Sequence, residues 1–157
     1  MNAIKKALFK VVAKGSGPMI KHMYLTTGDF SKAFYIKNGQ ESLPMITEIV
    51  SKHGAELAEI MQKMISIKTM KDVGESYEMV NSVMELGIEP IESSNDAFHF
   101  KITKCLYGLE GTSKELCEVM MVADKKMVSA VLGQEVEMKI IKSVAAGDKN
   151  CEVVFSK

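Results

Sequence analysis

Residues 98–105 read FHFKITKC, and this stretch, together with the helix-like run that follows it, decides the fold. Phe98, Phe100 and Ile102 alternate with polar side chains. A period of two is typical of a strand that is buried on one face only. The chain is therefore expected to contain a sheet with one face on a hydrophobic core.

A helix and two more strands are expected after this strand. Residues 112–132 read TSKELCEVMMVADKKMVSAVL, and Thr112 and Glu115 stand three apart as in a capping box, which predicts one continuous helix. Strands are expected over residues 135–143 and 151–155. The last third of the chain is thus predicted to be a strand–helix–strand–strand unit.

Upstream of this unit the sequence predicts helices. Apolar residues between 41 and 65 recur at the period of an amphipathic helix, and a second helix is expected over 71–86 with Thr69 as its cap. Residues 1–40 are weakly patterned, and we expect there only a short helix starting at Ser16.

A short strand at 88–91 contains Pro90, which places it at an edge of the sheet because proline has no backbone N–H to donate. We expect one α+β domain over residues 1–157, with N-terminal helices packed on one face of a small, mostly antiparallel sheet. A chain of 157 residues is long enough to bury about two-thirds of its unfolded surface.

The charge balance argues against two kinds of partner. Twenty acidic residues balance 20 basic ones, all of them lysine, so neither nucleic acid nor membrane insertion is expected. The first 17 residues are too short and too charged for a signal sequence, which indicates a cytoplasmic protein. No glycine-rich phosphate-binding motif is present, so no nucleotide cofactor is expected.

The three cysteines are expected to meet. If the strands that flank the 112–132 helix run parallel, Cys105, Cys117 and Cys151 all lie at one end of the sheet. Thiolates favour soft metals, so the unit over residues 97–157 is a candidate site for zinc, with iron as the other candidate. The alternative is three unlinked cysteines buried in the core.

A tetrahedral metal site needs a fourth donor. His99 lies six residues along a strand from Cys105, roughly 20 Å, which is too far unless the strand bends. The remaining candidates are nearby carboxylates or a water molecule. These carboxylates are those of Glu110, Glu118, Asp124 and Asp148.

Thirteen methionines are many for this length, and methionine suits the wall of a pocket for a flexible apolar ligand. The candidates on predicted helices are Met61, Met64, Met84, Met120, Met121 and Met127. Packing of an ordinary core explains the same residues equally well.

Three segments, 98–105, 107–117 and 142–155, resemble the vinyl-4-reductase (hydrocarbon-binding) domain family. The resemblance implies a small-molecule-binding module with a fold similar to haem nitric-oxide-sensor domains and Golgi-transport TRAPP subunits. It also implies zinc ligands: Cys117 and Cys151 match two of the family's cysteines. The positions of the remaining Glu-x-x-Cys pair are occupied by Ile140 and Ser143, and Cys105 is the expected substitute.

Three functions are weighed on this basis. The first is a metal-stabilised module that senses or carries a small apolar molecule. The second is a metal-dependent reductase or hydrolase that works with a cofactor-bearing partner, with Asp124 or His99 as acid–base group. The third is a structural subunit, and the long apolar helix face favours a homodimer.

Overall fold

The computed structural model describes residues 3–157, and it describes side chains from Gly15 onward with the exception of Val83. Helices and strands are combined as the sequence predicts, which confirms the α+β class. In chain order the elements are α1 (Ala3–Asn38), the 3-10 helix η1 (Gly39–Ser42), α2 (Leu43–Met64), α3 (Met70–Met84), β1 (Ile88–Ser93), β2 (Ala97–Ile102), α4 (Lys114–Met120), α5 (Val122–Leu132), β3 (Glu137–Lys142), the 3-10 helix η2 (Val144–Ala146) and β4 (Cys151–Ser156).

The four strands form one sheet in the order β1-β2-β4-β3, and every neighbouring pair is antiparallel. β2 and β3 therefore run in the same direction with β4 between them. Ile102, the last residue of β2, pairs with Cys151, the first residue of β4. The ends of β2 and β3 consequently lie at the same end of the sheet, as the sequence predicts.

Both edges of the sheet are irregular. β1 is one edge strand, as expected from Pro90, and its register with β2 shifts between Pro90 and Glu92. β3 is the other edge, and its register with β4 shifts between Ile140 and Lys142. Such shifts bend an edge strand and interrupt its row of hydrogen-bonding groups.

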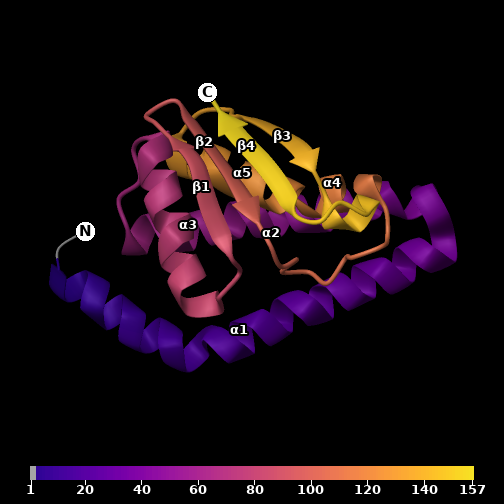
Figure 1. Cartoon of the computed structure of the whole chain (residues 1–157), viewed down its shortest axis with the longest axis horizontal. Helices are drawn as coiled ribbons and strands as arrows, with labels where there is room; N and C mark the ends of the chain where they lie inside the picture. Colours follow the sequence, from indigo (N-terminus) through magenta and orange to yellow (C-terminus); the bar gives the residue numbers. More distant parts are fainter. Residues whose placement is uncertain (1–2) are drawn as a thin grey trace.

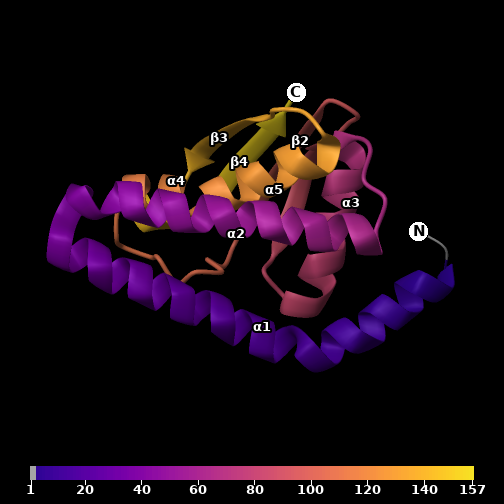
Figure 2. The same cartoon turned by 180° about the vertical axis from the view of Figure 1, so that it is seen from behind.

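Helices cover one face of the sheet (Figures 1 and 2), with α2 running alongside α5 on the side away from the strands. The long α1 crosses below this body and turns back into α2 through η1. The arrangement leaves the other sheet face open, and β2 buries Phe98 and Phe100 but not His99 between them.

Three helix predictions are corrected by the structure. The expected short helix at Ser16 is part of α1, which continues through Pro18. The expected single helix over 112–132 is divided into α4 and α5 at Met121. The cap of α4 is Ser113, whose hydroxyl accepts a hydrogen bond from Leu116 N, whereas the Thr112 hydroxyl donates to Leu109 O.

The cap of α3 is as predicted. The Thr69 hydroxyl accepts a hydrogen bond from Asp72 N, and the Asp72 carboxylate accepts one from Thr69 N at 2.9 Å. These reciprocal bonds satisfy two N–H groups that the first turn of a helix leaves free. They fix the start of α3, which carries Tyr77 toward the interior.

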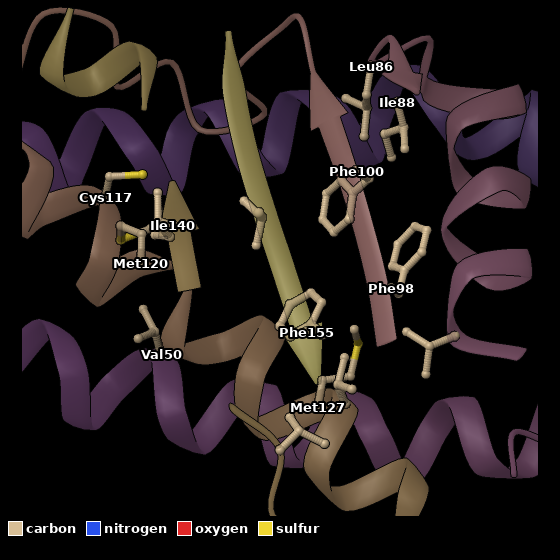
Figure 3. Packing of buried hydrophobic residues seen from close by; sticks show 14 of the residues in the cluster. Val50, Leu86, Ile88, Phe98, Phe100, Cys117, Met120, Met127, Ile140 and Phe155 are labelled. Carbon is tan, nitrogen blue, oxygen red and sulfur yellow. The ribbon is translucent and has the colours of Figure 1, made fainter. Parts of the chain in front are cut away.

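Aromatic rings form the centre of the core. Phe98, Phe100 and Phe155 are fully buried on the helix-covered face of the sheet, and Figure 3 shows Phe155 beside Met127 of α5. The Phe98 and Phe100 rings stack with centroids 4.6 Å apart, and Tyr77 lies 5.4 Å from Phe100. This cluster joins β2 and β4 to α3.

The solvent side of α1 is unusually apolar, with Met19, Met23, Phe30 and Ile36 all exposed. This surface fits the homodimer expected from the sequence, but the homodimer stays a prediction. In the described part of the chain, no helix combines the length and apolar character needed to cross a membrane.

Candidate functional site

A cavity of about 380 Å³ lies between the sheet and the helices. Its size falls in the usual range for small-molecule sites. Its walls are almost entirely apolar and come from α1, α2, α3, α4, α5, the sheet and the segment after β2. Leu57, Ile60 and Met64 of α2 are also exposed, so they mark the side where the cavity approaches solvent.

Methionines form much of the wall. All six of the methionines predicted to line a pocket face this cavity, and Met79 does so as well. Met120 is fully buried, and Met84 and Met127 are nearly so, which means that the same side chains also belong to the core. These methionines therefore both line the pocket and pack in the core, as the two explanations from the sequence proposed. That a ligand occupies the pocket stays a prediction.

The structure brings the three cysteines to the same cavity. Cys105 follows β2, Cys117 is in α4 and Cys151 begins β4, as expected from the direction of the strands. Each thiol is free, and Cys117 and Cys151 are buried. Cys105 Sγ accepts a hydrogen bond from Leu109 N at 3.4 Å, and Cys151 Sγ accepts one from Val144 N at 3.5 Å.

Two of the three thiols, those of Cys117 and Cys151, are held in their neutral form. Burial raises the pKa of Cys117 to about 11, and the nearby Cys151 and Cys105 add to this, whereas a hydrogen bond from Ser143 opposes it. Burial also raises the pKa of Cys151, against the hydrogen bond from Val144. Neutral thiols are poor nucleophiles and must lose a proton to bind a metal.

The described part of the chain does not show the metal site that the sequence predicts. Among the described residues, no group of three or more His, Cys, Asp or Glu side chains is arranged as a metal site. Ile140 has no donor atom, and the Ser143 hydroxyl is engaged with Ala145 N and Cys117, so these two positions do not supply the pattern of the resembling family. A zinc or iron site at the three cysteines stays a prediction.

Of the expected fourth donors, the structure places only Asp124 on the cavity wall. His99 lies on the opposite face of the sheet and contacts Glu152 at 3.0 Å. Glu118 pairs with Lys114 at 3.5 Å, and Asp148 accepts a hydrogen bond from Ser143 N. Glu110 is exposed outside the cavity.

Asp124 is the polar centre of the site. It lies in the first turn of α5, and its Oδ1 accepts a hydrogen bond from the Tyr77 hydroxyl at 2.7 Å. Burial raises the pKa of this carboxyl, while the hydrogen bonds from Tyr77 and from its own backbone act in the opposite direction. A carboxyl in an apolar cavity is a typical candidate for ligand recognition or acid–base work.

Three of the four tyrosines of the chain surround this carboxyl. Burial and the Asp124 charge raise the pKa of Tyr24 to about 12, and both raise the pKa of Tyr77 and of Tyr107 well above the usual value. The Tyr24 and Tyr107 rings meet edge to face at 5.4 Å. The sequence did not identify these three residues, because no local period or spacing relates them.

Two glycines permit the close approaches that form the site. A Cβ at Gly28 of α1 would overlap the carbonyl oxygen of Tyr107, and a Cβ at Gly54 of α2 would overlap that of Ala123. The first contact brings α1 against the segment that carries Tyr107. The second brings α2 against the start of α5, directly beside Asp124.

A comparison with protein families gives one match. The model of the family described as L-2-amino-thiazoline-4-carboxylic acid hydrolase matches residues 19–155. The vinyl-4-reductase name expected from the sequence is therefore not confirmed, although binding domains of the related fold are found among known structures. No curated protein matches the chain.

Solved structures with a similar fold include the following two. One is the phenol-responsive sensory domain of the transcription activator PoxR with phenol, at 14% identity and a TM-score of 0.60, over 85% of this chain and 73% of that one. The other is a trafficking protein particle complex subunit 3 from Naegleria fowleri covalently bound to palmitic acid, at 16% identity and a TM-score of 0.55, over 87% and 93%. These likenesses confirm the expected TRAPP-type fold.

Proposed function

The chain belongs to the L-2-amino-thiazoline-4-carboxylic acid hydrolase family, and within it we propose that this protein binds a small, largely apolar molecule in its central cavity. The observation that carries the proposal is the cavity of about 380 Å³, whose apolar wall surrounds one hydrogen-bonded carboxyl. Apolar walls with few polar groups are the usual form of a small-molecule site. The phenol complex of the PoxR domain supports a similar use of this fold.

Native mass spectrometry of the purified protein and calorimetric titration with 4-phenylbutanol test this proposal. We expect one retained or added molecule per chain. Met61→Trp places a larger side chain on the cavity wall, so we expect it to weaken binding at least about ten-fold through steric exclusion.

Met45→Trp is the matched control, because Met45 belongs to the same helix but is exposed and does not line the cavity. We expect this variant to bind as the wild type does. No retained cargo, together with no binding across a library of neutral, cationic and anionic apolar compounds, would contradict the proposal.

Hydrolysis is the second candidate function, and two observations favour it. The family name identifies a hydrolase, and Asp124 is a half-buried carboxyl beside a tyrosine hydroxyl. With L-2-amino-thiazoline-4-carboxylic acid as substrate, Asp124 would accept a proton from a water that attacks the amino-substituted ring carbon. The bond from that carbon to the ring sulfur would then break, and the sulfur would leave with the proton as a thiol. Ring opening by the wild type and its loss in Asp124→Asn, followed by mass spectrometry, would establish this activity.

The metal hypothesis is tested separately. We propose that Cys105, Cys117 and Cys151 hold one zinc or iron ion, on the basis of their convergence in the cavity. Elemental analysis of protein from metal-replete medium should then find one ion per chain, and Cys117→Ser and Cys151→Ser should each lose it. A wild-type protein without stoichiometric metal would show that these thiols are only part of the wall.

A further inference from the structure

The titratable groups of the cavity wall are almost all acids. They are Asp124, the three tyrosines Tyr24, Tyr77 and Tyr107, and the three cysteines. Among the residues whose side chains the structure describes, Lys104 is the single basic residue that lines the cavity, and Lys104 itself is exposed to solvent. Within this described lining, a negative ligand group in the interior of the cavity would meet a carboxyl and no cation.

Asp124 forms no ion pair with any of the described residues. Its hydrogen-bonding partner is Tyr77, which donates to Oδ1. Asp124 is half-buried in an apolar wall, and a carboxylate held there without a cation is costly, so a positive partner would offset that cost. The helix α5 contributes only a partial positive charge at its first turn.

The rings around Asp124 suit a positive partner as well. Tyr24 and Tyr107 meet edge to face, and Tyr77 reaches the carboxyl through its hydroxyl. The faces of aromatic rings attract organic cations, most strongly where water is excluded. The Asp124 carboxylate of α5 thus lies with three tyrosines, which come from α1, α3 and the segment after β2. Together they form a part of the apolar cavity that attracts cations.

We propose that the ligand of this cavity is an organic ammonium ion with an apolar body, whose charged nitrogen lies at Asp124 among Tyr24, Tyr77 and Tyr107. The inference rests on the proposed binding function and specifies its ligand class. The apolar body would lie along the methionine wall, where Met61, Met120 and Met127 adapt to its shape.

Three probes with the same body and different head groups test the proposal. They are 4-phenylbutylamine, 4-phenylbutanol and 4-phenylbutyrate, titrated by calorimetry at pH 7. We expect the amine to bind about ten-fold more tightly than the alcohol, which corresponds to one charge-assisted hydrogen bond, and the carboxylate to bind most weakly.

Two variants test whether the preference for the amine over the alcohol depends on Asp124. Asp124→Asn removes the charge and keeps the shape, so the amine should lose its advantage while the alcohol binds as before. Glu115→Gln is the matched control, because Glu115 is an exposed carboxylate of α4 that does not line the cavity, and its preference should equal that of the wild type.

A pH series on the wild type needs no variant and decides the question even if Asp124→Asn fails to fold. Burial raises the pKa of Asp124, so the carboxyl takes up a proton at a higher pH than an exposed aspartate does, and the amine should bind more weakly as the pH is lowered. The surrounding Tyr24, Tyr77, Tyr107 and Cys117 have pKa values raised above their ordinary, already alkaline values, so they keep their protons as the pH falls. The alcohol should show no such trend.

The possible results distinguish a failure of the ammonium assignment from a failure of the proposed small-molecule binding. Equal affinities for amine and alcohol, or a preference for the carboxylate, overturn the ammonium assignment and leave small-molecule binding in place. Failure of all three probes to bind overturns the ammonium assignment and counts against the binding function itself.

Discussion

Phe100→Ala is expected to lower the free energy of unfolding by about 3–5 kcal/mol. The Phe100 ring is fully buried, stacks on Phe98 at 4.6 Å and lies 5.4 Å from the Tyr77 ring. Its removal leaves a void among side chains that belong to β2, β4 and α3. These side chains cannot fill the void unless the strands shift and lose backbone hydrogen bonds between β2 and β4. Urea unfolding followed by circular dichroism measures the loss.

Phe30→Ala is the control for this effect. Phe30 lies on the solvent side of α1 with 74% of its surface exposed, so the same change of residue should alter stability by less than about 0.5 kcal/mol. A loss below 1 kcal/mol for Phe100→Ala would show that the aromatic cluster is not the centre of the core.

Gly54→Ala is expected to destabilise the protein by about 1–3 kcal/mol, although alanine is the better helix former. The added Cβ would overlap the Ala123 carbonyl, so α2 and α5 must move apart. Because Ala123 precedes Asp124, the same displacement should weaken ligand binding in the cavity. Thermal unfolding and titration with 4-phenylbutylamine measure the two effects.

Gly15→Ala is the matched control, since Gly15 lies in α1 with nothing within 4 Å of an added Cβ. There the higher helix propensity of alanine should stabilise the protein by up to about 1 kcal/mol and leave binding unchanged. Equal effects of the two substitutions would mean that the contact between α2 and α5 is looser than the structure indicates.

The local patterns of the sequence predicted most of the fold. The alternation around Phe100 identified β2, Thr69 identified the start of α3, and Pro90 identified the edge strand. Each of these signals depends on neighbours in the chain. The full length of α1 was not predicted because Gly15 and Pro18 weaken the helical pattern of the sequence. Contacts with distant residues, such as that of Gly28 with Tyr107, hold this helix against the rest of the domain.

The site was predicted in part for the same reason. The three cysteines could be brought together because strand direction fixes where the ends of strands lie. The ring of Tyr24, Tyr77 and Tyr107 depends on three elements separated by long stretches of chain, and no period or spacing relates them. Only their packing around Asp124 shows that they belong to one site.

The irregular edges of the sheet have a consequence for behaviour at high concentration. Pro90 has no backbone N–H to donate from β1, and the register of both edge strands shifts. A strand from another copy therefore meets no continuous row of backbone hydrogen-bonding groups on either edge of the sheet. Both features therefore oppose edge-to-edge pairing of sheets from different copies, which is the step that builds a fibre. If copies of this chain associate, the helical surface around Phe30 offers the easier route.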